Sequence, residues 1–263
     1  MTAPSSSPLA LGELLAAATA TAAAATEAIL SLEDGPQFLR VKSSPTDPVT
    51  AADVAADTAI RARLTEARPL DGLLSEDGEA IESRNGLRWV ADPLDGTVNY
   101  LHGIPNIAVS LACEAYLDGS WQAVVGVVSD VLRGEQFTAV RGGGSNLDGT
   151  PLRVRDPVPL SRAVLATEFG YLREDRRRQA AQLALLAPQA AEVRATGSSA
   201  IDLCWLAAGR LDGYFEDELS RWDWAAGRLV VEEAGGVVSG FGDGVLAAGA
   251  HLHENLRHLL KVG

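Results

Sequence analysis

Residues 87–103 read LRWVADPLDGTVNYLHG and carry the most informative pattern in this chain of 263 residues. Residues 87–91 are a short apolar run, typical of a strand. The run stops at Asp92, Pro93, Leu94 and Asp95, so two acids leave the strand three residues apart and a turn can direct both toward one point. Two like charges about 4 Å apart repel by roughly 4 kcal/mol at an effective dielectric near 20. The pair therefore predicts a cation between the two carboxylates.

The surroundings of this acid pair indicate which cation and which chemistry. Carboxylate oxygens suit a hard ion such as Mg²⁺. Gly96 and Thr97 follow as the expected start of a helical turn, whose backbone N–H groups favour an anion such as phosphate. The stretch thus favours metal-assisted phosphate chemistry. Asp-Pro and Asp-Gly pairs also form ordinary turns, so taken alone it leaves a plain loop as the alternative.

The composition is that of a globular protein, 47% hydrophobic and 22% charged. The formal net charge of −13, with no basic block to offset it, argues against a nucleic-acid or anionic-membrane surface. Cys113 and Cys204 lie in apolar surroundings and are interpreted as core residues. No segment resembles a signal peptide, and no uncharged apolar run reaches membrane-spanning length. We therefore expect a cytoplasmic protein with no membrane or nucleic-acid partner.

Periodicity and turn residues predict alternating helices and strands. Pro-rich residues 151–159 are expected to form a crossover, which divides the chain into an N-terminal half, 1–155, and a C-terminal half, 156–263. Helices are predicted over residues 9–32, 51–67, 175–186, 200–208 and 221–235. Strands are predicted over residues 73–75, 87–91, 107–115, 124–131, 135–140, 163–167, 213–216, 237–238 and 245–248.

Further acids stand at the ends of these predicted elements. Asp53 and Asp223 occupy the third position of capping boxes that begin with Thr50 and Ser220. An acid at that position caps a helix without any chemistry, and acidic loops after strands are usually solvated. Each acid therefore has an ordinary explanation when it is considered separately.

Taken together, the motifs resemble the inositol monophosphatase family of Mg²⁺-dependent, Li⁺-sensitive phosphatases. The resemblance covers roughly residues 42–236. Residues 92–97 (DPLDGT) match the first signature of the family, and the other matching segments are 222–227 (WDWAAG) with 233–236 (EAGG), 42–53 (KSSPTDPVTAAD), 194–200 (RATGSSA) and 209–214 (GRLDGY).

The resemblance implies an α+β fold, namely a layered αβαβα sandwich of the inositol monophosphatase and fructose-1,6-bisphosphatase type with mainly antiparallel sheets. It implies two Mg²⁺ ions, and a third, weaker one near Glu76 and Asp77. The family often has Gly-Glu-Glu where this chain has Ser75-Glu76-Asp77, which puts the third ion in question. None of the four histidines has a metal-ligand spacing. The implied ligands are Glu76, Asp92, the Leu94 carbonyl and Asp95 for the first ion, and Asp92, Asp95 and Asp223 for the second.

The implied reaction is direct in-line hydrolysis by a metal-activated water that Thr97 and Asp53, with Glu76, orient toward phosphorus. The backbone N–H groups of Gly96 and Thr97 would cradle the phosphate. Lys42 lies on the loop that approaches the metal site in this family. The implied contacts to the alcohol hydroxyls are Asp95, Gly197, Ser198, Ser199, Glu216 and Asp223.

The expected function is inositol-1-monophosphatase activity on a small-molecule phosphomonoester, in a homodimer. Histidinol phosphate is the second candidate, because Glu216 could bind its ammonium group; fructose 1,6-bisphosphate and adenosine bisphosphate are other substrates within the family. A haloacid-dehalogenase phosphatase is less compatible, since two residues rather than one separate Asp92 from Asp95. A regulatory interaction protein is the non-enzymatic alternative.

Overall fold

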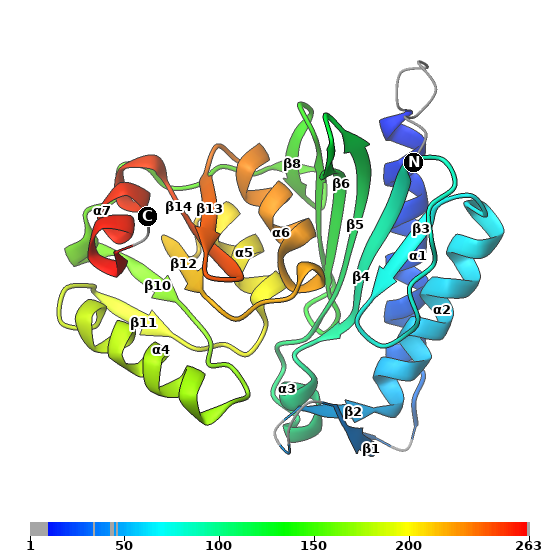
Figure 1. Cartoon of the computed structure of the whole chain (residues 1–263), viewed down its shortest axis with the longest axis horizontal. Coiled ribbons are helices and arrows are strands. Elements are labelled where there is room, and N and C mark those ends of the chain that lie inside the picture. Colours follow the sequence, from blue (N-terminus) through cyan, green and yellow to red (C-terminus); the bar gives the residue numbers. More distant parts are fainter. Residues whose placement is uncertain (1–9, 34, 43–44, 46, 262–263) are drawn as a thin grey trace.

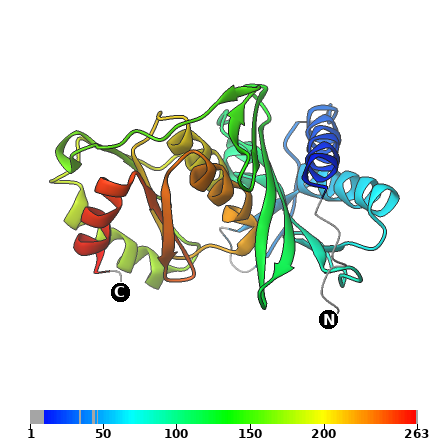
Figure 2. The ribbon, with the colours of Figure 1, turned by 90° about the horizontal axis from the view of Figure 1, so that it is seen from above.

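The structure is a computed structural model that describes residues 10–33, 35–42, 45 and 47–261. Residue 9 of the first predicted helix and residues 43, 44 and 46 of the upstream motif lie outside this part. Helices and sheets alternate in five layers (Figures 1 and 2). This is the αβαβα sandwich that the resemblance implied. From right to left in Figure 1, the layers are α1 (Leu11–Leu30) with α2 (Ala51–Ala67), a seven-stranded sheet, α5 (Ser199–Ala207) with α6 (Arg221–Glu233), a five-stranded sheet, and α4 (Arg173–Leu186) with α7 (Ala250–Leu260).

The seven-stranded sheet belongs to the first part of the chain. Its order is β3-β4-β5-β6-β7-β8-β9, and only the β3–β4 pair is parallel among its described strands. Its strands are buried on both faces, since Trp89 packs toward α1 and α2 while Val90 packs toward α5 and α6. Burial on both faces explains the continuous apolar runs. The strands are β3 (Gly72–Ser75), β4 (Leu87–Asp95), β5 (Ala108–Leu117), β6 (Ser120–Asp130), β7 (Glu135–Val140), β8 (Gly144–Leu147) and β9 (Thr150–Pro151).

The five-stranded sheet has the order β11-β10-β12-β14-β13, in which β10 runs parallel to both of its neighbours. The chain passes from one sheet to the other between Pro151 and Val164. The predicted boundary at residues 155 and 156 falls in this segment and stays a prediction. The strands are β10 (Val164–Ala166), β11 (Glu192–Arg194), β12 (Gly213–Glu216), β13 (Val237–Phe241) and β14 (Gly244–Ala248).

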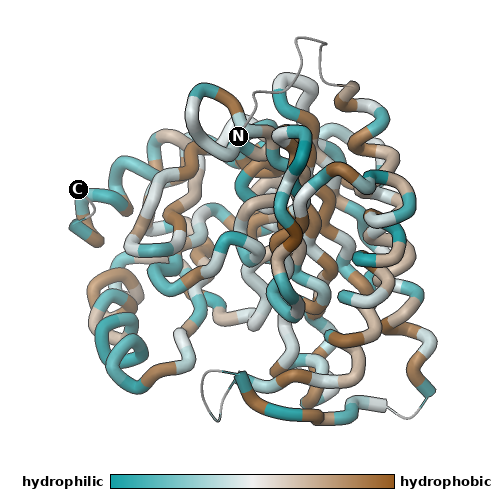
Figure 3. The backbone as a smooth tube through the Cα atoms, turned by 45° about the vertical axis from the view of Figure 1, so that its right-hand side comes forward, coloured by the Kyte–Doolittle hydropathy of each residue, from teal (hydrophilic) through white to brown (hydrophobic). Residues whose placement is uncertain are grey.

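Helix α1 is long and apolar enough to cross a membrane by length and composition. Its buried residues, among them Ala18, Ala22 and Ile29, belong instead to the core between α2 and the seven-stranded sheet. Figure 3 shows hydrophobic residues concentrated in the strands of that sheet. The helix therefore covers a sheet face, as helices do in layered α/β folds.

The middle helical layer lies very close to its neighbours at two glycines. A Cβ at Gly126 of β6 would stand 3.0 Å from the carbonyl oxygen of Ala226, and a Cβ at Gly227 would stand 2.8 Å from the Cβ of Leu203 in α5. Side chains at either position would push α6 away from β6 or from α5. The two glycines thus let α6, which carries Asp223 in its first turn, pack closely on both neighbours.

Several elements differ from the sequence-based prediction. Strand β4 continues through Asp95, because a register shift between Asp92 and Asp95 lets the chain stay paired with β5 past Pro93. A hairpin of β1 (Phe38–Val41) and β2 (Pro48–Thr50) replaces part of the expected polar loop. Strands β8, β9 and β11 and helix α7 were not predicted. The two cysteines are free and buried, as expected.

Candidate active site

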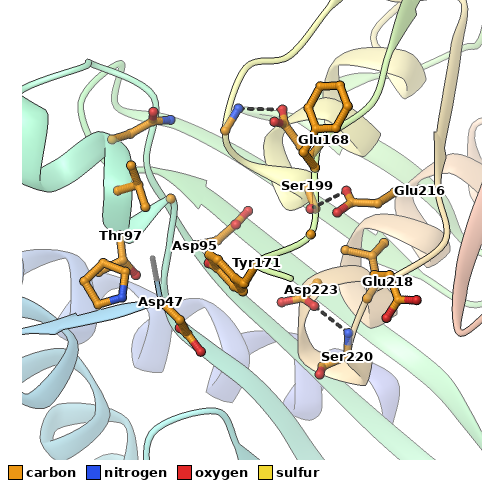
Figure 4. A pocket seen from close by; sticks show the side chains of 18 of the residues that line it. Asp47, Asp95, Thr97, Glu168, Tyr171, Ser199, Glu216, Glu218, Ser220 and Asp223 are labelled. Carbon is orange, nitrogen blue, oxygen red and sulfur yellow. Dashed lines mark hydrogen bonds between the residues drawn. The ribbon is translucent and has the colours of Figure 1, made fainter. Parts of the chain in front are cut away.

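A cavity of about 1120 Å³ opens at the end of β4 (Figure 4). One wall comes from the β1–β2 hairpin, Glu76 directly after β3, the end of β4 and the short helix α3 (Thr97–His102). The other comes from residues 168–172, 195–197 and 199 and from the start of α6. Asp53, Asp77 and Ser198 do not line it. The predicted site residues that do are Lys42, Glu76, Asp92, Leu94, Asp95, Gly96, Thr97, Gly197, Ser199, Glu216 and Asp223.

The end of β4 directs both of its acids inward. Asp92 pairs with Ser110 of β5 and Asp95 with Ala108, and the register shift between them accommodates the two intervening residues. The Oδ1 atom of Asp92 accepts a hydrogen bond from the N–H of Leu94 at 3.0 Å, which closes the turn. The two acids are 2% and 8% exposed. The strand exit therefore buries two carboxylates within one turn of backbone.

Carboxylates from three segments repel one another here. Burial raises the pKa of Asp92 well above its usual range, and the charges of Glu76, Asp95 and Asp223 raise it further. Burial likewise raises the pKa of Asp223, and the charges of Glu76 and Asp95 raise it further. The structure thus brings together the acid after β3, the pair on β4 and the capping acid of α6. We call these four residues the acid cluster.

Asp95 also ties the two walls of the cavity together. Its Oδ2 atom accepts hydrogen bonds from Ser198 Oγ at 2.6 Å and from the N–H of Ala200 at 2.8 Å. Burial raises its pKa to about 6, although these hydrogen bonds oppose the shift. These hydrogen bonds hold the Oδ2 atom against the start of α5.

Asp53 both caps α2 and supports the site. Its Oδ2 atom accepts hydrogen bonds from the Thr50 N–H at 2.7 Å and the Thr50 hydroxyl at 2.5 Å, which completes the predicted capping box. Its Oδ1 atom lies 3.0 Å from Thr97 Oγ1, which is also 3.1 Å from the carbonyl oxygen of Leu94. From the sequence, capping of α2 and a role in the site were alternative interpretations of Asp53. The hydrogen bonds of its two carboxylate oxygens allow both.

Lys42 supplies a cation beside the acid cluster. Its Nζ atom lies 2.8 Å from Glu76 Oε1 and 2.8 Å from Asp77 Oδ1. Burial lowers the pKa of Lys42, but the charges of Glu76 and Asp77, with their hydrogen bonds, raise it above the usual range. The β1–β2 hairpin thus brings its lysine to the acids that the resemblance assigned to the third ion.

The donor chemistry of the acid cluster fits a hard divalent cation such as Mg²⁺. All of the implied donors are oxygens, and their mutual repulsion in a buried setting is what a cation would relieve. In the described part of the chain, no three acid, histidine or cysteine side chains are already arranged around one point as metal ligands. The ammonium of Lys42, bound to Glu76, shows that this corner accepts positive charge.

The opposite wall carries one acid that the sequence analysis missed. Glu168 Oε1 accepts the N–H of Gly197 at 2.5 Å, and burial raises the pKa of Glu168 to about 7. Glu216 Oε2 accepts hydrogen bonds from the hydroxyls of Tyr214 at 2.5 Å and Ser199 at 3.4 Å. Figure 4 shows Glu168, Ser199 and Glu216 on one side of the cavity and Thr97 and Asp95 on the other. An acid directly after a predicted strand, here residues 163–167, was the signal available for Glu168.

The raised pKa values predict how pH affects stability without a metal. Unfolded acids titrate near pH 4, whereas Asp95 and Glu168 in the folded protein titrate at about 6 and about 7. Between pH 4 and these raised pKa values, the folded state therefore binds more protons than the unfolded state. The stability of the folded state decreases as the pH rises through this range to about 7. We expect the free energy of unfolding of the metal-free protein to be roughly 3 kcal/mol higher at pH 5.5 than at pH 8.

Thermal unfolding across this pH range measures the effect. Added Mg²⁺ should remove the part of the effect that comes from Asp95, because the cation competes with protons for the oxygens of that side chain, and it should leave the part that comes from Glu168. A transition temperature that decreases steadily from pH 8 to pH 5.5 in chelator would contradict the prediction.

Comparison with known proteins was made on sequence and on structure. The model of the inositol monophosphatase family matches residues 10–260. A Mycobacterium tuberculosis protein named inositol-1-monophosphatase SuhB is 41% identical over 211 residues, which are 77% of this chain and 71% of the relative. A Pasteurella multocida protein named Nus factor SuhB is 40% identical over 205 residues, or 76% of this chain and 74% of the relative.

Among solved structures, the extragenic suppressor protein suhB from Bartonella henselae has the same arrangement of layers. It matches with a TM-score of 0.87 and 35% identity, covering 95% of this chain and 99% of that chain. The likeness therefore extends over both sheets and the helical layer between them.

Proposed function

The chain belongs to the inositol monophosphatase family and is a phosphomonoester hydrolase, and from this we propose that it uses Mg²⁺ to hydrolyse inositol 1-phosphate to myo-inositol and phosphate. The observation that carries the proposal is the acid cluster, in which acids from the end of β3, from β4 and from the first turn of α6 line one cavity. Buried carboxylates that repel one another are retained where a cation and a phosphate are bound.

The chain's own side chains have distinct tasks in this reaction. Bound Mg²⁺ would neutralise the charge of the phosphoryl oxygens and lower the pKa of the attacking water. Thr97 has one hydroxyl proton, and when it donates this proton to Asp53 its oxygen is left to accept a hydrogen bond from that water. Asp53 is held by Thr50, so this acceptor is in place before the substrate arrives, and the Leu94 carbonyl oxygen is the second acceptor within reach of the Thr97 hydroxyl. The backbone N–H groups of Gly96 and Thr97, at the start of α3, would contact the phosphate.

The alcohol side of the cavity supports a polyol as the leaving group. Glu216 and Ser199 present oxygens into it, and Gly197 lies beside them. Such acceptors bind hydroxyl groups. The same carboxylate could bind the ammonium of histidinol phosphate, which makes that ester the second candidate substrate.

One relative carries the name Nus factor SuhB, which favours a regulatory interaction as a second candidate function. The net charge of −13 favours a protein partner over direct binding to nucleic acid. Both functions are compatible in one chain, because a regulatory contact would use the outer surface and the phosphatase reaction uses the cavity.

Other features of the proposal come from the family resemblance. We propose a cytoplasmic homodimer that Li⁺ inhibits, with two Mg²⁺ ions at each site and a third, weaker one near Glu76 and Asp77. Lys42 would leave these acids when the third ion binds.

A phosphate-release assay tests the proposal. The purified protein is supplied with inositol 1-phosphate, histidinol phosphate, fructose 1,6-bisphosphate and adenosine 3′,5′-bisphosphate, with Mg²⁺ or with chelator. We expect Mg²⁺-dependent turnover with the highest kcat/KM for inositol 1-phosphate. Highest activity on histidinol phosphate would favour the second substrate, and no turnover of any ester would favour the interaction protein.

A further inference from the structure

The segment that follows β3, residues 76–79, is held in place by helix α2, and we call it the β3 exit segment. Ser75, the last residue of β3, donates a hydrogen bond from its hydroxyl to Asp57 Oδ1 at 2.6 Å. Both residues are buried. Ser75 and Asp77 are also the two positions at which the chain departs from the Gly-Glu-Glu pattern noted above. A glycine at position 75 would have no hydroxyl for this contact with α2.

Arg61 of α2 holds the far end of the β3 exit segment. Its Nε atom lies 2.5 Å from Asp57 Oδ2, and its Nη1 atom donates a hydrogen bond to the carbonyl oxygen of Glu79 at 2.8 Å. The guanidinium group also covers Gly78, where an added Cβ would overlap it. Asp57 and Arg61, one helical turn apart, therefore fix the segment at its start and at its end.

The β3 exit segment carries the two acids that lie beside Lys42. Glu76 belongs to the acid cluster, and the side chain of Asp77 is almost completely buried. Both carboxylates lie 2.8 Å from Lys42 Nζ. The N–H of Glu76 donates to the carbonyl oxygen of Ala91 at 3.2 Å, which joins the segment to β4 as well. The direction of both carboxylates thus depends on a short segment that is fixed at both ends.

Helix α2 also holds the exit of β4. Asp53 stands one turn before Asp57, so the two carboxylates project from the same face of the helix. Asp53 Oδ1 accepts the hydroxyl of Thr97, directly beyond the acid pair of β4, while Asp57 accepts that of Ser75. The first turns of α2 therefore set the separation between the ends of β3 and β4, from which three of the four acids of the acid cluster come.

We propose that Asp57, Arg61 and Ser75 are positioning residues for the cation site. They hold the β3 exit segment so that Glu76 and Asp77 are directed at this site before an ion binds. The proposal rests on the proposed Mg²⁺-dependent function, because Glu76 is an implied ligand of the ion. Contacts that orient metal ligands from behind contribute about 10- to 100-fold to metal affinity. A segment that is already ordered also loses less conformational entropy when the ion binds.

Calorimetry with Mg²⁺ alone tests the proposal on Ser75→Ala, which removes the hydroxyl and leaves the ion pair of Asp57 with Arg61. We expect the apparent dissociation constant for Mg²⁺ to rise about tenfold. In phosphate release, the Mg²⁺ concentration for half-maximal activity should rise by the same factor. The kcat at saturating Mg²⁺ should stay close to that of the wild type, because a bound ion holds the carboxylates itself. A merely structural defect would lower kcat at every Mg²⁺ concentration.

A matched control is Ser145→Ala in β8, since Ser145 is also buried and its Oγ atom has no hydrogen-bond partner among the described residues. Its apparent dissociation constant should equal that of the wild type. Arg61→Lys is the second variant and decides the matter if Ser75→Ala does not fold. The lysine keeps a charge beside Asp57 but lacks the planar fork that also reaches Glu79, so it should weaken Mg²⁺ binding too.

Amide hydrogen exchange in chelator measures the positioning without metal or turnover. The N–H groups of the β3 exit segment should exchange about tenfold faster in Ser75→Ala than in the wild type. Binding of Mg²⁺ without turnover would refute the phosphatase function, while the Mg²⁺ affinities would still judge the positioning residues. The proposal is overturned if exchange or Mg²⁺ affinity in Ser75→Ala is unchanged, if the control changes equally, or if the wild-type protein binds no Mg²⁺.

Discussion

Replacing Asp95 with asparagine is expected to lower kcat about a thousandfold, or about 4 kcal/mol, while the protein stays folded. The asparagine side chain would keep an acceptor for Ser198 Oγ and the Ala200 N–H, so the link between β4 and α5 would survive. The amide would remove one of the clustered negative charges and, with its oxygen bound to Ser198 and Ala200, would leave its NH₂ group in place of the second carboxylate oxygen. A divalent cation would then lose a charged ligand at the position nearest to the second wall.

The measurement is steady-state phosphate release at saturating substrate and a series of Mg²⁺ concentrations. Circular dichroism and thermal unfolding verify the fold, and in chelator the variant should be at least as stable as the wild type, because one repelling charge is gone. Asp118→Asn, in the turn between β5 and β6, is the control for an acid-to-amide change far from the cavity. Retention of more than a tenth of the wild-type kcat would refute the role of Asp95.

Replacing Gly96 with alanine is expected to cost roughly 3 kcal/mol of folding stability and to lower activity about a hundredfold. Gly96 has φ of +94°, a region that L side chains rarely adopt. Its Cβ would also stand 2.8 Å from the carbonyl oxygen of Asn106 and 3.1 Å from that of Gly197. These atoms are backbone, so the new methyl group can fit only if the two walls move apart, which would displace Asp95 and Thr97 on either side of it.

Gly103→Ala separates backbone strain from crowding. Gly103 ends α3 with φ of +65°, and a Cβ there would meet no atom within 4 Å. This control should lose only about 1 kcal/mol and keep its activity. Urea unfolding and phosphate release are measured for both variants. Equal losses in the two would show that crowding between the walls contributes nothing.

Apolar runs and capping boxes are local signals, and they predicted most of the helices and strands. Thr50 with Asp53 and Ser220 with Asp223 both form the predicted capping boxes. Helix α7 was missed, although its charged residues alternate with Leu252 and Leu256, which pack on the outer sheet. The resemblance to a known family, rather than periodicity, supplied the order of the layers.

The candidate site was predictable where acids stand next to a turn or a cap. Glu168 directly follows a predicted strand, but acids at such positions are usually solvated, and its place beside Gly197 and near Glu216 is apparent only in the structure. The approach of Lys42 to Glu76 also depends on a hairpin, β1–β2, whose apolar residues are too few to signal strands. Contacts between segments far apart in the chain leave no local trace in the sequence.

Two glycines at the contacts of α6 with its neighbours, one in β6 and one in α6 itself, affect the distance between acids of the site. Gly126 and Gly227 allow α6 to approach β6 and α5, and α6 carries Asp223 while β4 of the same sheet carries Asp92. The distance between these two carboxylates therefore depends on two positions without a Cβ atom, neither of which contacts a ligand. A substitution at either glycine would change the distance between the carboxylates while every residue that contacts the substrate stays the same.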